Sequence, residues 1–134
     1  MKSYSEIEAM DLFDHITKPK VLLVDVRNDD EVARGIIPGA MHIQLSMLPL
    51  QYEKLMGASS VVFYCHSGVR SAHAADFAVS KGVQDVFNLI GGVVAWGLNN
   101  SAQTDVPTDL TNVAAIAGGN GYSLVLKSDR KSVV

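Results

Sequence analysis

Three short apolar runs follow one another along this chain. None shows the alternation of apolar and polar residues that is expected of a strand in a sheet with one solvent-exposed face. They are VLLVDV (residues 21–26), VVFYC (61–65) and DVFNL (85–89). A strand that is apolar on both faces must be covered on both, which is typical of parallel sheets in α/β proteins. The segment from Ser71 to Lys81 has helical spacing. The sequence therefore predicts an α/β fold, with a mostly parallel sheet and helices on both faces.

Shorter elements are expected around these runs. Ser5 and Glu8 form the pattern of a capping box, which predicts a helix running on through Ile7, Met10 and Phe13. Four more elements are expected: a short helix capped by Asn28 and Asp29 and ended by Gly35, a short strand near 41–43, a helix over 46–56, and a turn with a short helix over 91–97.

Length and charge exclude several classes of function. A chain of 134 residues is expected to hold one main domain with its own core. Eleven basic and fourteen acidic residues offer no basic surface for nucleic acid or an anionic membrane. No secretory signal or membrane span is predicted, and a single cysteine rules out an internal disulfide, so a cytoplasmic location is expected. The histidines and the cysteine match no zinc pattern, and we expect neither a metal nor a cofactor.

The alternation of strands and helices stops near Ser101. We therefore expect a domain over residues 1–105 and a C-terminal extension of unknown role over 106–134. Two short strands around the turn-forming residues Gly118 to Gly121 are one interpretation of the extension, and a tail without function is the other. Residues 111–134 are expected to be dispensable for the chemistry and to pack on the domain or on a second subunit.

Cys65 is placed where an α/β protein binds its ligands, at the carboxyl end of a predicted parallel strand and before a helix. Backbone amides from His66 to Ser71 can converge on its sulfur and lower the pKa of the thiol. Gly68 permits the turn, and Arg70 adds a positive charge. A buried structural cysteine is the alternative, but polar residues and a glycine follow the thiol where a buried strand would stay apolar.

Three stretches in this order resemble the rhodanese (thiosulfate sulfurtransferase) family, single-domain type. They are VLLVDVRNDDEVARGIIPGAMHI (21–43), VVFYCHSGVRSAHAADFAVSKG (61–82) and VFNLIGGVVAW (86–96). They lie between residues 21 and 96. The resemblance implies a five-stranded parallel sheet flanked by helices, with Cys65 as the catalytic nucleophile. Two positions depart from the family pattern: Ile36 stands where many members have His, and His66 stands where many have Arg.

The activity that this resemblance implies is sulfur transfer in two steps. Cys65 would take a sulfur from a small anionic donor such as thiosulfate and carry it as a persulfide. The acceptor would be cyanide, a thiol or a thioredoxin-like protein. The substrate-binding residues would be those of the loop: His66, Ser67, Gly68, Val69, Arg70 and Ser71.

Two charged residues at the end of the first apolar run are expected to support this loop without taking part in bond-making. Asp25 could accept hydrogen bonds from Arg70 or from loop amides, and Arg27 could pair with Glu31 one turn later. Arg70 itself could bind the anion or brace the loop.

Other functions remain open for a chain of this kind. Phosphatases of the dual-specificity, cell-cycle type share the fold but place five residues between cysteine and arginine, whereas four separate Cys65 from Arg70. A non-catalytic rhodanese-like module that binds a partner is a second alternative, although such modules often lack the cysteine. An arsenate reductase would need further thiols.

Overall fold

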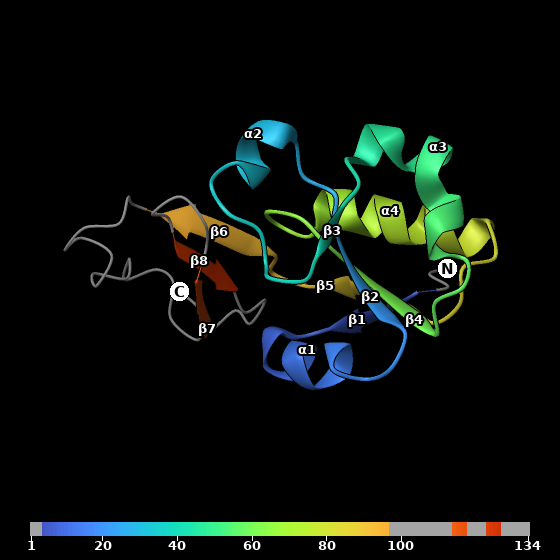
Figure 1. Cartoon of the computed structure of the whole chain (residues 1–134), viewed down its shortest axis with the longest axis horizontal. Coiled ribbons are helices and arrows are strands. Elements are labelled where there is room, and N and C mark those ends of the chain that lie inside the picture. The colour runs from blue at the N-terminus through green and yellow to red at the C-terminus, as the bar shows by residue number, and fades with distance from the viewer. Residues whose placement is uncertain (1–3, 97–113, 118–122, 127–134) are drawn as a thin grey trace.

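A computed structural model describes residues 4–96, 114–117 and 123–126. Its main feature is a five-stranded parallel sheet with the strand order β1-β5-β4-β2-β3 (Figure 1). The strands are Ser5–Ile7 (β1), Val21–Asp25 (β2), Met41–His42 (β3), Ser60–Tyr64 (β4) and Val86–Leu89 (β5). The predicted α/β class and the three central strands are confirmed.

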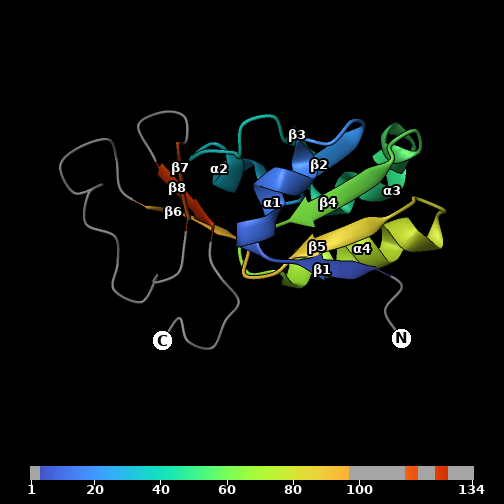
Figure 2. The ribbon, with the colours of Figure 1, turned by 90° about the horizontal axis from the view of Figure 1, so that it is seen from below.

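Helices cover both faces of this sheet. Ala9–Ile16 (α1) lies on one face, and Leu48–Gln51 (α3) and Val69–Ser80 (α4) lie on the other (Figures 1 and 2). Asp29–Val32 (α2) follows β2, and two 3-10 turns, Leu45–Met47 and Tyr52–Leu55, flank α3. Asn28 caps α2, as the sequence predicts, and it also forms a capping box with Glu31.

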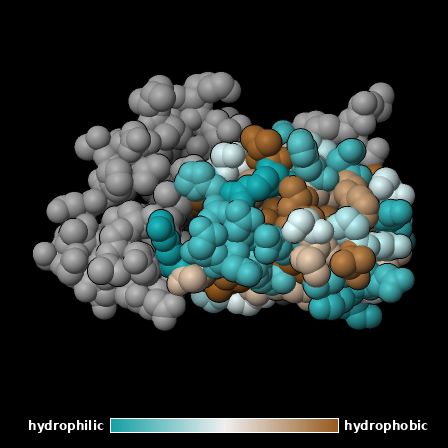
Figure 3. Space-filling model, turned by 90° about the horizontal axis from the view of Figure 1, so that it is seen from above, coloured by the Kyte–Doolittle hydropathy of each residue, from teal (hydrophilic) through white to brown (hydrophobic). Residues whose placement is uncertain are grey.

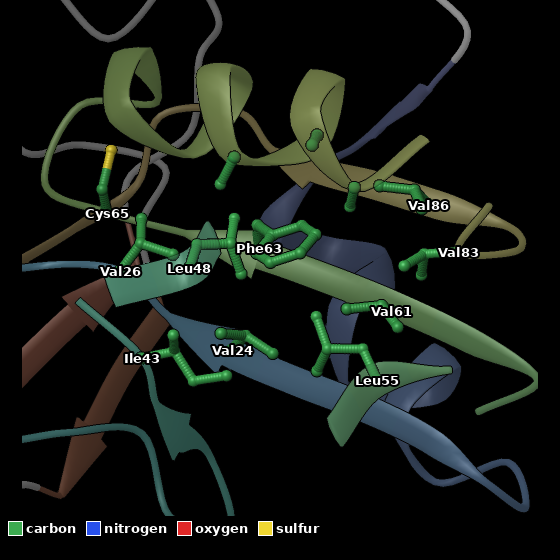
Figure 4. Packing of buried hydrophobic residues seen from close by; sticks show 13 residues of the cluster. Val24, Val26, Ile43, Leu48, Leu55, Val61, Phe63, Cys65, Val83 and Val86 are labelled. Atoms are coloured by element: carbon green, nitrogen blue, oxygen red, sulfur yellow. The ribbon is translucent and has the colours of Figure 1, made fainter. Parts of the chain in front are cut away.

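Each face of the sheet has its own core. The side toward α4 contains Val24, Phe63 and Ala78, with Cys65 at its end (Figure 4). The side toward α1 contains Leu12, Val62 and Tyr64. Neighbouring residues of β4 thus contribute to opposite cores, which explains why its whole run is apolar.

The outer surface of the helices is mixed in character. In Figure 3 hydrophilic residues gather over α2, and apolar residues are interspersed among polar ones over α3 and α4. Met47, Leu50 and Met56, in and beside α3, are exposed. In the described part of the chain, every helix is too short or too polar to cross a lipid bilayer.

Two sequence predictions about local structure were wrong, and a third was confirmed only in part. Ser5 starts strand β1 instead of capping a helix, and α1 begins only at Ala9 after Glu8. Met10 and Phe13 are exposed, and the buried residues of α1 are Ala9 and Leu12. The segment 46–56 is divided among α3 and its two 3-10 turns, and 93–96 forms a strand, β6, instead of a helix.

A second sheet joins the end of the domain to the C-terminal extension. Its antiparallel strands are Val93–Trp96 (β6), Ala114–Ala117 (β7) and Ser123–Leu126 (β8), in the order β6-β8-β7. The interpretation of the extension as two strands is therefore confirmed, and β8 pairs directly with β6. The predicted turn at Gly118 to Gly121 lies outside the described residues.

Candidate active site

Cys65 lies directly after β4, at the carboxyl edge of the sheet, and α4 begins four residues later. Gly68 precedes the helix with a backbone φ of 100°, in the left-handed region that glycine adopts without strain. This turn folds the first residues of α4 back toward the cysteine. Figure 4 shows the sulfur directed toward the start of that helix.

The sulfur of Cys65 receives hydrogen bonds from the chain that follows it. The backbone amide of Gly68 donates at 3.1 Å and that of Ser71 at 3.3 Å, while the hydroxyl oxygen of Ser71 lies 3.4 Å away. Burial raises the pKa of this thiol, but hydrogen bonds that the ionised sulfur can accept from the Ser71 hydroxyl and from the Ser71 and Gly68 amides lower it, and the resulting pKa is below the ordinary value for cysteine. The loop thus favours a thiolate, the nucleophilic form of the side chain.

Asn88, the third residue of β5, ties the loop to the sheet. Its amide nitrogen donates to the carbonyl oxygen of Gly68 at 3.2 Å, and its Oδ1 accepts a short hydrogen bond of 2.5 Å from the Ser71 hydroxyl. Asn88 therefore binds two residues, Gly68 and Ser71, whose amides contact the sulfur. From the sequence this residue is expected only as part of a buried strand; the available signal was an amide side chain near the end of an otherwise apolar run.

Arg70 forms an ion pair with Glu31 of α2. Its two terminal nitrogens contact the two carboxylate oxygens at 2.7 and 2.9 Å. The hydrogen bonds from Arg70 lower the pKa of Glu31 to about 2. Because that pKa is depressed, the pair stabilises the fold above the ordinary value near 4.5, and this contribution is lost as the pH falls toward about 2. The prediction that Glu31 pairs with Arg27 was wrong.

Asp25 and Arg27 bind each other and are both buried. Nε of Arg27 lies 3.0 Å from each carboxylate oxygen, and one terminal nitrogen, Nη2, donates to Asp25 at 2.7 Å and to the carbonyl of Gly35 at 2.7 Å. The Asp25 carboxylate also accepts a hydrogen bond from the backbone amide of Arg27. The expected hydrogen bond from Arg70 to Asp25 is therefore replaced by this local pair, which fastens the end of β2 to the segment after α2.

The other side of the loop contacts the start of β6 and the turn before it. The Val93 amide donates to the carbonyl of Cys65 at 2.9 Å. Nδ1 of His66 lies 3.0 Å from the carbonyl of Val93, and since a carbonyl only accepts, this nitrogen carries the proton. Gly92 approaches so closely that a Cβ there would lie 2.3 Å from the His66 carbonyl oxygen. The sequence predicts only that Gly92 belongs to a turn, and this contact with the cysteine loop is not visible in it.

A pocket of about 300 Å³ opens beside the loop. Ser67, Gly68 and Val69 form one side of it, and Glu6, His73 and Asn88 contribute to the rest. Ser67 is exposed at the surface of the loop. Within the described residues, no group of three or more His, Cys, Asp or Glu side chains is placed to hold a metal ion.

The six predicted loop residues therefore divide by what they touch. Gly68 and Ser71 contact the sulfur through their amides, and Arg70 is held by Glu31. His66 is anchored on Val93, and Ser67 and Val69 line the neighbouring pocket.

Comparison with known proteins agrees with this architecture. The family model of the rhodanese-like domain matches residues 8–99. A sulfurtransferase of Allochromatium vinosum is 40% identical over 76 residues, which make up 57% of this chain and 71% of the relative. The thiosulfate sulfurtransferase GlpE of Coxiella burnetii is 29% identical over 93 residues, or 69% of this chain and 87% of the relative.

Solved structures show the same likeness. A rhodanese-like domain protein from Staphylococcus aureus superposes with a TM-score of 0.60 at 31% identity, covering 66% of this chain and 86% of its own. A protein of Rhodopseudomonas palustris described as a possible tyrosine phosphatase gives a TM-score of 0.61 at 30% identity, covering 67% and 76%. Because the family model matches most of this chain, the chain belongs to the rhodanese-like domain family.

Proposed function

We propose that this protein is a sulfurtransferase, which accepts a sulfane sulfur from thiosulfate or a similar anion on Cys65 and passes it to a thiol or to cyanide. The observation that carries the proposal is the pair of backbone amides, of Gly68 and Ser71, that converge on the Cys65 sulfur. Its family membership and its sulfurtransferase relatives support the same class of reaction.

The first step is a displacement at sulfur. The Cys65 thiolate attacks the outer sulfur of thiosulfate, the S–S bond of the donor breaks, and sulfite leaves with the bonding electron pair. The amides that hold the thiolate also stabilise the anionic persulfide that results. Because Cys65 is fully buried, the donor reaches it only when the residues around the sulfur move apart.

The second step must involve another molecule. Cys65 is the only cysteine, so no thiol of the same chain can resolve the persulfide as an intramolecular disulfide. An acceptor thiolate or cyanide attacks the outer sulfur, and the Cys65 thiolate leaves. A thiol of pKa near the ambient pH, on a small molecule or a thioredoxin-like protein, suits this step best. A reducing cytoplasm is the matching location.

A phosphatase is the competing proposal, since one structural neighbour is described as a possible tyrosine phosphatase. The loop argues against it here. Four residues separate Cys65 from Arg70, and the Gly68 and Ser71 amides lie within hydrogen-bonding distance of the sulfur itself. This arrangement suits a single bound sulfur better than a tetrahedral phosphate.

The decisive experiment is mass spectrometry of the intact protein after treatment with thiosulfate. We expect a gain of ~32 Da, one sulfur, on wild type and none on Cys65→Ser, because only a thiolate performs the displacement. Without an acceptor, about one sulfite per chain should be released, and cyanide should restore turnover as thiocyanate. No adduct on wild type, together with Cys65-dependent hydrolysis of p-nitrophenyl phosphate, would overturn the proposal in favour of a phosphatase.

Arg70→Ala is expected to raise the KM for thiosulfate several-fold while lowering the free energy of unfolding by only about 1 kcal/mol, as a partly exposed ion pair contributes little. The matched variant is Glu31→Gln, which weakens the brace but keeps the cation beside the loop. A KM that rises only for Arg70→Ala assigns Arg70 to donor binding. An unchanged KM with a large drop in melting temperature would make Arg70 a structural brace.

A further inference from the structure

Asn88 is nearly buried at the end of β5, with 4% of its surface exposed, and β5 lies beside β4, which leads into Cys65. Its carboxamide contacts Gly68 on one side and Ser71 on the other. The amides of these two residues donate to the sulfur. Both hydrogen-bonding groups of the carboxamide are engaged by them, so the influence of Asn88 on the thiol passes through these two residues.

The direction of each hydrogen bond around Ser71 follows from counting protons. The Gly68 carbonyl only accepts, so the amide nitrogen of Asn88 faces it and Oδ1 faces Ser71. Oδ1 also only accepts, so the single hydroxyl proton of Ser71 lies on that side. The hydroxyl oxygen can then only accept from the thiol proton of Cys65, at 3.4 Å.

Ionisation of Cys65 reverses this arrangement. A thiolate has no proton to donate, so the Ser71 oxygen would face a negative sulfur with its lone pairs. The contact between the Ser71 hydroxyl and the thiolate becomes favourable when the hydroxyl turns its proton toward the sulfur. Oδ1 of Asn88 then loses the hydrogen bond that it accepted from Ser71. Two acceptors therefore compete for one proton.

We propose that Asn88 is a positioning residue that competes with the Cys65 sulfur for the hydroxyl proton of Ser71. The Ser71 hydroxyl stabilises the thiolate only when it turns away from Asn88. The hydrogen bond from Asn88 to Gly68 has a separate effect, since it holds the loop and its amides in place. The proposal deepens the sulfurtransferase function above, because it concerns the ionisation on which that function depends.

The test is a double-mutant cycle read from the rate of Cys65 alkylation by iodoacetamide as a function of pH. Cys65 is the only cysteine, so the apparent pKa belongs to this thiol alone. The four proteins are wild type, Ser71→Ala, Asn88→Ala and the double variant. Loss of the Asn88 bond to Gly68 loosens the loop in both backgrounds and cancels in the comparison.

We expect Asn88→Ala to favour the thiolate more in the wild-type background than in the Ser71→Ala background, by about three- to tenfold in the thiolate-to-thiol ratio. Equal shifts in the two backgrounds, or a difference of opposite sign, would overturn the proposal. Ser60→Ala is the matched control. It removes a different buried serine hydroxyl, which lies in β4 and donates to the Asp85 carbonyl. This variant should leave the pKa of Cys65 measured by alkylation unchanged.

Asn88→Asp provides a second cycle if the alanine variant does not fold, because it preserves the volume and the acceptor oxygen. A carboxylate holds the Ser71 proton more firmly, so this variant should disfavour the thiolate more in the wild-type background than in the Ser71→Ala background. An equal effect in both would contradict the competition. Alkylation requires no sulfur donor, so failure of this inference and failure of the sulfurtransferase proposal are separate outcomes.

Discussion

Asp25→Ala is expected to lower the free energy of unfolding by about 3–5 kcal/mol, because it leaves a buried guanidinium without its counter-ion. Asp25 is fully buried and Arg27 is 2% exposed, so water cannot replace the lost carboxylate. The Arg27 guanidinium would still donate to the Gly35 carbonyl, but that neutral acceptor does not balance its charge. Urea denaturation followed by circular dichroism measures the loss.

Asp29→Ala is the matched control for this prediction. Asp29 is four residues further along, and its side chain is 89% exposed, facing His42 at 3.8 Å. Its removal should change the unfolding free energy by less than about 1 kcal/mol. Replacing both members of the buried pair by apolar residues, Asp25→Leu with Arg27→Met, should cost less than Asp25→Ala alone. If Asp25→Ala were no more costly than Asp29→Ala, the pair would not be the brace described here.

Gly92→Ala is expected to destabilise the protein by about 3 kcal/mol or more and to remove sulfur acceptance by Cys65. The new Cβ would lie 2.3 Å from the His66 carbonyl oxygen and 2.4 Å from that of Cys65. These are backbone atoms, so the Cys65–His66 peptide must move, and the hydrogen bond from the Val93 amide to Cys65 is lost with it. Denaturation and the ~32 Da thiosulfate adduct report the two effects.

Gly39→Ala is the control that separates the steric clash of a Cβ at Gly92 from the cost of backbone strain. Gly39 has a φ of 88°, comparable to the 67° of Gly92, but a Cβ there meets nothing within 4 Å. That variant should show only the cost of a left-handed residue, about 1–2 kcal/mol, with the adduct intact. Equal behaviour of the two variants would show that close packing against the cysteine loop is unimportant.

The central architecture could be predicted from local patterns. A strand buried on both faces must be apolar throughout, so β2, β4 and β5 are visible in the sequence without knowledge of their partners. The position of Cys65 at the carboxyl edge follows from the order of strand, loop and helix alone. The cap of α2 is equally local, because Asn28 and Glu31 are three residues apart.

The edges of the sheets could not be predicted in this way. Ser5–Ile7 (β1) is short, and it is a strand because it pairs in parallel with β5, far along the chain. Ser5 and Glu8 carry a pattern that suits a helix start, and the distant pairing overrides it. β6 likewise becomes a strand by pairing with β8 in the C-terminal extension.

Local sequence is enough to identify the residues that surround the sulfur, since Cys65, Gly68 and Ser71 are close along the chain and their geometry is that of one turn. The way in which this turn is held depends on tertiary packing. The pairs Arg70–Glu31 and Asn88–Ser71, and the approach of Gly92 to Cys65, join residues 17 to 39 positions apart. Arg70, for example, was expected beside Asp25, but the packing of the elements places it on Glu31.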